Sequence, residues 1–84
     1  MIVTIPGYST IIGRPERILS VMQEARMFDS HKGDAYINAI KETAKRLFDV
    51  DLNVKGETYA ERAESLLLEM AKNKMIIIEE RKSR

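Results

Sequence analysis

The feature that most constrains this chain is a helix-initiation signal in which Thr58 precedes Glu61 by three residues and follows Gly56 by two. The Thr58 hydroxyl can accept a hydrogen bond from the backbone N–H of Glu61, while the Glu61 carboxylate can reach back to the Thr58 N–H. This reciprocal pattern is a capping box, and an apolar stripe at helical spacing follows it. A helix is therefore predicted from the residue after Thr58 to Asn73, an amino acid that tolerates the left-handed conformation in which many helices end.

Two further helices are predicted from apolar residues that recur at helical spacing. The first starts near Pro15, because a proline in the first turn of a helix loses no hydrogen bond. The second starts at Gly33 or Asp34, after a polar loop at residues 29–33. The predicted buried faces are Ile18, Leu19, Val21, Met22 and Ala25 in the first helix, Tyr36, Ile37, Ile40, Ala44, Leu47 and Phe48 in the second, and Tyr59, Ala63, Leu66, Leu67 and Met70 in the third.

Strands are predicted at both ends of the sequence. Residues 1–5 and 9–12 are rich in β-branched side chains on either side of a Pro-Gly turn, which indicates a short hairpin or a bent strand. Residues 50–54 alternate between apolar and polar, as in a strand or an extended link. Residues 75–79 have the β-branching of a strand buried on both faces. The predicted fold is α+β: one domain over residues 1–80, with N- and C-terminal strands paired beneath three helices, and a basic solvated tail at residues 81–84.

Composition narrows the class of protein. The chain has 84 residues, of which 44% are hydrophobic and 32% are charged, and this balance is typical of a folded domain. A single core of this size gives little net stability, which favours self-association. The net charge of +1 provides no overall attraction to nucleic acid or to an anionic membrane. No apolar run is long enough to span a bilayer, so we expect a cytoplasmic protein without membrane contacts.

The sequence contains few residues that could form a catalytic site. The chain has no cysteine, so thiolate zinc sites and a cysteine nucleophile are excluded. Its one histidine, His31, lies in the polar loop, where the simplest interpretation is an exposed side chain. One histidine with scattered carboxylates gives neither a zinc set nor a calcium loop. We therefore expect no enzyme activity, no metal and no cofactor.

The best candidate for a small-anion site is the segment around Arg14 and Arg17, where a strand leads into a helix. Free backbone N–H groups and two guanidinium groups could meet a phosphate or carboxylate there, and Tyr8 could stack on a base or sugar. The alternative is a helix start with solvated arginines. Pro15 removes one backbone donor, and the glycine repetition of a phosphate-binding loop is missing.

Two other surfaces are candidates for partners. Nucleic acid would use the basic tail or the cluster Lys41, Lys45 and Arg46, but acidic residues interrupt both, and a charge run is most often a solvated face. Apolar residues off the predicted stripes favour a homo-oligomer, because pairing of strand edges or helix faces would bury them. These residues are Met27, Phe28, Leu68 and the isoleucine run at 76–78.

Residues 1–80 resemble a loosely defined group of short phage and prophage proteins from Gram-positive bacteria. The resemblance rests on the early strand ending at Gly13, the helix start at Pro15, the helix at residues 34–48, and residues 54–64. Similar small phage proteins include accessory factors that bind host regulators, inhibit host defence or sequester signalling nucleotides. The resemblance implies a non-enzymatic binding protein that occupies a host protein or a small anionic ligand in the host cytoplasm. The alternative is a small DNA-binding transcriptional regulator.

Overall fold

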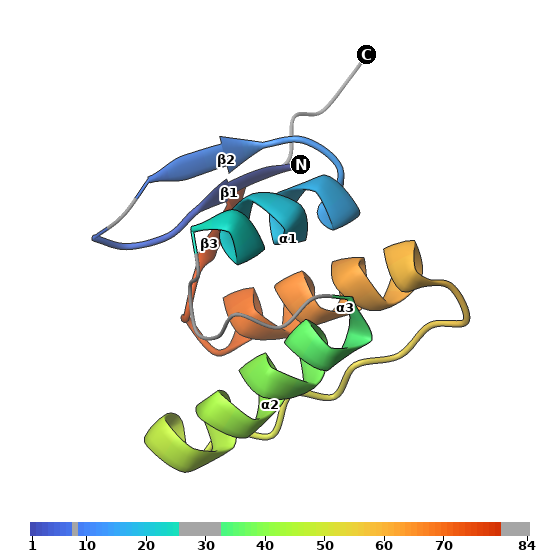
Figure 1. The fold of residues 1–84 in the computed structure, drawn as a ribbon. Helices are drawn as coiled ribbons and strands as arrows, with labels where there is room; N and C mark the ends of the chain where they lie inside the picture. Colours follow the sequence, from blue (N-terminus) through green and yellow to red (C-terminus); the bar gives the residue numbers. More distant parts are fainter. Residues whose placement is uncertain (8, 26–32, 80–84) are drawn as a thin grey trace.

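Strands from both ends of the chain meet in one sheet, and three helices lie to one side of it (Figure 1). A computed structural model describes residues 1–7, 9–25 and 33–79. In chain order, the elements are β1 (Ile2–Thr4), β2 (Thr10–Ile12), α1 (Pro15–Glu24), α2 (Asp34–Phe48), α3 (Tyr59–Lys72) and β3 (Ile77–Glu79). The α+β prediction is confirmed, including the pairing of the first and last strands.

The sheet is antiparallel throughout, in the order β2-β1-β3. Residues 1–12 form a hairpin in which the Ile5 N–H donates to the Ser9 carbonyl at 2.9 Å. Val3 lies opposite Ile11 on one side and opposite Ile78 on the other. Because side chains alternate along a strand, these three residues share one face of the sheet, and that face points toward the helices.

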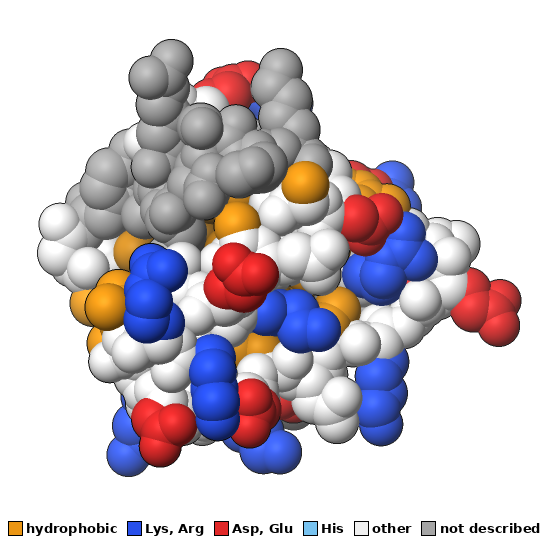
Figure 2. All heavy atoms as spheres, turned by 60° about the horizontal axis from the view of Figure 1, so that its bottom comes forward, with side chains coloured by type: hydrophobic (Ala, Val, Ile, Leu, Met, Phe, Trp, Pro, Cys, Tyr) orange, Lys and Arg blue, Asp and Glu red, His pale blue; other side chains and the backbone are white. Residues whose placement is uncertain are grey.

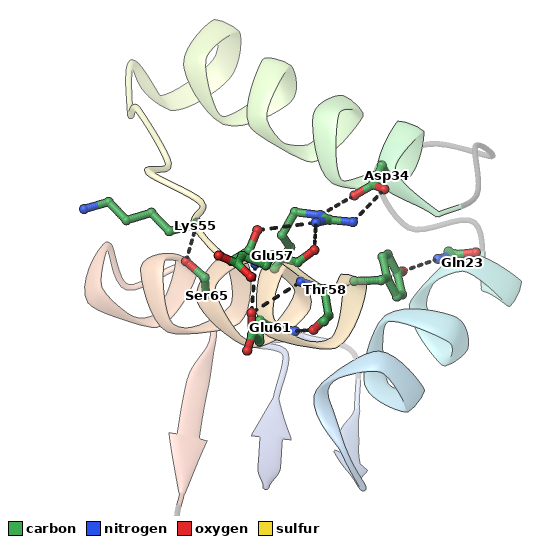
Figure 3. Close-up of polar contacts among 10 residues, drawn as sticks. Gln23, Asp34, Lys55, Glu57, Thr58, Glu61 and Ser65 are labelled. Carbon is green, nitrogen blue, oxygen red and sulfur yellow. Dashed lines mark hydrogen bonds and ion pairs between the residues drawn. The ribbon is translucent and has the colours of Figure 1, made fainter.

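The helices form two further layers. Helices α1 and α3 contact each other and lie against the sheet, while α2 packs on α3 on the side away from the sheet (Figures 1 and 3). The core lies between these layers. It comprises Val3, Ile5, Ile11, Ile18, Leu19, Met22, Tyr36, Ile37, Ile40, Ala44, Leu52, Ala63, Leu66, Leu67, Met70 and Ile76. Most of the predicted stripes are therefore confirmed.

The last turn of α2 departs from its predicted stripe. Leu47 is 64% exposed and Phe48 is 57% exposed, whereas Ala44, one turn earlier, is fully buried. The helix extends past the end of the core, so the predicted burial of its last two apolar residues is wrong. Asp49 then ends α2 in the left-handed conformation, with φ of 56°.

The end of α3 is where it was predicted, but for a different reason. Asn73 caps the helix with φ of −97°, and the left-handed residue is its neighbour Lys74, with φ of 64°. This turn directs the chain back into β3. The strand is not buried on both faces as predicted, because Ile77 is 54% exposed while Ile76, just before the strand, is buried.

Between α2 and α3 the chain is extended and pairs with no strand among the described residues. Leu52 is buried, whereas Val50 and Val54 are half-buried and pack against the core. Of the two structures predicted for residues 50–54 from their alternating apolar and polar side chains, the extended link is the one observed. Tyr8, Met27, Phe28, His31 and the tail at 81–84 lie outside the described residues.

Candidate functional site

The capping box at the start of α3 is fully formed (Figure 3). The Glu61 N–H donates to the Thr58 hydroxyl oxygen at 3.1 Å, and the Thr58 N–H donates to the Glu61 carboxylate at 3.3 Å. The same carboxylate accepts a shorter bond of 2.8 Å from the Glu57 N–H. The polar groups of this motif are therefore engaged in starting the helix, as the sequence predicts.

Side chains of α3 accept hydrogen bonds from the backbone N–H groups of the extended link and hold the link against the helix. The Lys55 N–H donates to the Ser65 hydroxyl at 2.9 Å, and the Asn53 N–H donates to the Glu69 carboxylate at 3.1 Å. An open hollow of about 420 Å³ lies over these bonds. Its polar lining has a structural task, because these bonds satisfy backbone donors of a segment that belongs to no sheet.

One arginine joins three segments of the chain. Arg62 donates to both carboxylate oxygens of Asp34, at 2.8 and 3.0 Å, and to the backbone carbonyl of Glu57 at 3.0 Å. The hydrogen bond to Asp34 is the main reason that the pKa of Arg62 is raised. This bidentate pair connects the starts of α2 and α3 with the link, which the sequence did not reveal because the partners are 28 residues apart.

The Glu61 carboxylate makes the stability of the fold depend on pH. Hydrogen bonds from the Glu57 and Thr58 N–H groups hold its pKa below the ordinary value of 4.5. The unfolded chain therefore binds this proton at a higher pH than the folded chain does. Stability from this group is present above pH 4.5 and is lost as the pH falls through the folded-state pKa.

We expect Glu61→Gln to flatten the rise of stability with pH below about pH 5, since glutamine keeps an oxygen acceptor but does not titrate there. Urea unfolding midpoints at a series of pH values measure this slope. Glu64→Gln removes a carboxylate at an exposed position on the same helix and serves as the matched control, and the slope for Glu61→Gln should be smaller than the slope for this control. Equal slopes for the wild type and Glu61→Gln would contradict the role of this carboxylate.

The predicted anion-binding residues lie at the start of α1. Arg14 is the N-cap, its side chain is 85% exposed, and its Nε lies 3.7 Å from the Glu16 carboxylate. Arg17 is also exposed, and its stem lies close to Gly13. The Gly13 N–H donates to the Met1 carbonyl at 3.0 Å, so this donor is already used. The anion site at these two arginines stays a prediction.

Acidic side chains accompany the predicted basic cluster on α2. Lys45 lies 3.4 Å from Asp49 and 3.5 Å from Asp51, and these carboxylates raise its pKa. Figure 2 shows basic side chains interspersed with acidic ones over this face. Such a mixed surface differs from the basic patch or stripe that is typical of nucleic-acid-binding proteins.

A more distinctive surface lies where α2 and α3 end, beside β3. A cavity of about 280 Å³ there is lined by Pro6, Phe48, Val50, Asn73, Lys74 and Met75. A second cavity of about 490 Å³ is lined by Pro6, Ala71, Lys74, Ile76, Ile77 and Ile78. The two cavities share Pro6 and Lys74 and are otherwise lined mainly by apolar residues, and we call them together the β3 groove. Among the residues that the structure describes, Lys74 is the only charged one that lines it.

The β3 groove could be predicted only in part. The sequence draws attention to the isoleucine run, and strand-edge pairing was one predicted use of it. The sequence predicts that Phe48 is buried in the core, because it continues the helical stripe of α2. Pro6 comes from the hairpin turn, and no local pattern connects it with residues near position 75.

Comparison with protein-family models, with curated proteins and with solved structures gave no match. No helix within residues 1–7, 9–25 and 33–79 is long and apolar enough to cross a membrane. Within the same ranges, no group of three acidic or histidine side chains could hold a metal ion.

Proposed function

We propose that this protein is a non-enzymatic binding protein that acts as a homo-oligomer and occupies a partner protein. In keeping with the resemblance to phage accessory proteins, the partner we propose is a protein of the host cell. A binding role of this kind requires an accessible surface whose burial is favourable. It requires no catalytic group.

The observation that carries the self-association in this proposal is the β3 groove. Phe48 and Ile77 are both more than half exposed, although sixteen of the described residues are buried in the core cluster. Single exposed apolar residues are ordinary, but a groove with several of them marks a surface that gains free energy when it is covered. The small core adds to this gain, since association stabilises a chain of this length.

The test is the mass of the purified protein in solution over a wide range of concentration. Sedimentation equilibrium should give a multiple of the 9.6 kDa chain mass at high concentration and a decrease on dilution. A monomer at every concentration would contradict the homo-oligomer.

A further inference from the structure

We propose that two copies of this chain associate through antiparallel pairing of their β3 strands, which joins two three-stranded sheets into one six-stranded sheet. This inference rests on the proposed homo-oligomer and names its interface. The partner at the β3 groove is then a second copy of the chain.

The first observation is that β3 is an edge strand. The sheet order β2-β1-β3 leaves one side of β3 unpaired by any strand among the residues the structure describes. A free edge carries backbone donors and acceptors that another strand can use. The N–H groups of Lys74 and Met75 already donate to the Ala71 and Met70 carbonyls. No proline interrupts residues 76–79, so each residue there keeps a backbone N–H.

The second observation is the apolar lining beside this edge. The larger cavity of the groove is formed by β3 itself together with Ala71 and Pro6. A strand that paired with β3 would therefore lie next to apolar side chains from α3 and from the hairpin turn. The other edge of the sheet, β2, lines neither cavity of the groove.

Charge favours a second copy of the chain as the occupant. Lys74 stands before β3 and Glu79 ends it, so the two ends of this segment carry opposite charges, and both residues are exposed. Antiparallel pairing about a twofold axis places the positive end of each copy beside the negative end of the other. A twofold interface has to be self-complementary in this way.

The alternation of side chains selects the register. Ile76 points into the core and Ile77 points out, so a continuous sheet must pair inward positions with inward ones. Pairing centred on Ile77 meets this condition. In this register Ile77 lies opposite Ile77 of the other copy on the outer face of the sheet. Ile76 then lies opposite Ile78, and Met75 lies opposite Glu79. Lys74 precedes Met75, so it lies one residue beyond the position opposite Glu79.

The size of the interface requires the groove as well as the ladder. A typical stable interface buries about 800 Å² on each partner, which is about one seventh of the 5714 Å² surface of this chain. A ladder over residues 75–79 alone cannot cover so much. We therefore expect Pro6, Ala71 and Lys74 to be covered together with β3.

The experiment compares two exposed isoleucines of the same sheet face, Ile77 on β3 and Ile12 on β2. Ile77→Lys sets two lysines against each other across the twofold axis and should raise the dimer dissociation constant at least about tenfold. Ile12→Lys adds the same charge at a position that is 71% exposed and should leave the constant unchanged. Sedimentation equilibrium gives both values, and circular dichroism shows whether each variant is folded.

Charge reversal supplies a second test that does not depend on Ile77. Lys74→Glu and Glu79→Lys should each weaken the dimer, and the double variant should recover part of the loss, because only between copies does Lys74 lie next to the residue that opposes Glu79. A wild-type dimer that tolerates Ile77→Lys, or a double variant no better than the single ones, overturns the β3 interface but leaves the homo-oligomer standing. A wild-type monomer at all concentrations overturns both.

Discussion

Replacement of Gly56 by alanine is expected to destabilise the protein by about 2–5 kcal/mol, through backbone strain together with overpacking. Gly56 has φ of 139°, a conformation that residues with a Cβ rarely adopt. An added Cβ would lie 2.7 Å from the Glu61 Cβ and 2.9 Å from the Arg62 backbone nitrogen. These atoms belong to the first turn of α3, so the clash can be relieved only by moving the helix start or the link.

Thermal unfolding followed by circular dichroism measures the effect. For a domain of this size each kcal/mol lowers Tm by about 4–8 °C, so we expect Tm to fall by roughly 10 °C or more. Gly7→Ala is the matched control. Gly7 also has a positive φ, of 78°, but apart from its chain neighbours no atom of the described residues lies within 4 Å of an added Cβ. Its cost should be limited to about 1–2 kcal/mol of backbone strain. Equal losses for the two variants would contradict the steric argument.

The residue at which α3 starts could be predicted, because the side chains that determine the start are close to it in the sequence. Thr58 and Glu61 satisfy each other's backbone groups, and no distant residue is needed. The end of the helix shows the limit of such reasoning. Asparagine is the residue expected to take the left-handed conformation, yet Lys74 takes it. The return of the chain into β3 requires the turn one residue later than local preference places it.

The candidate binding surface depends on contacts that no local pattern contains. β3 pairs with β1 across most of the chain, with Ile2 opposite Glu79, and this pairing decides which isoleucine faces the core. An apolar run predicts burial but not the side that stays open. Phe48 is exposed for a related reason, since α2 is longer than the core it covers. The sequence could thus predict the elements of the fold, whereas the position of the β3 groove required the structure.

Three consecutive leucines on α3 allow the fold to be tested by a contrast within one helix. Leu66 and Leu67 are fully buried, whereas Leu68 is 45% exposed. Leu67→Ala removes buried methyl groups and leaves a cavity, which should cost about 2–5 kcal/mol. Leu68→Ala removes little buried surface, and alanine is at least as favourable as leucine in a helix, so its cost should stay below about 1 kcal/mol.

Urea unfolding gives both free energies, and measurement at two protein concentrations separates folding from association. At low concentration only Leu67→Ala should lose stability, because the contrast belongs to the monomer. Equal losses at low concentration would mean that α3 does not present the face described here. Leu68 lies outside the β3 groove. Its replacement should therefore leave self-association intact, whereas Leu67→Ala should weaken self-association only to the extent that it unfolds the chain.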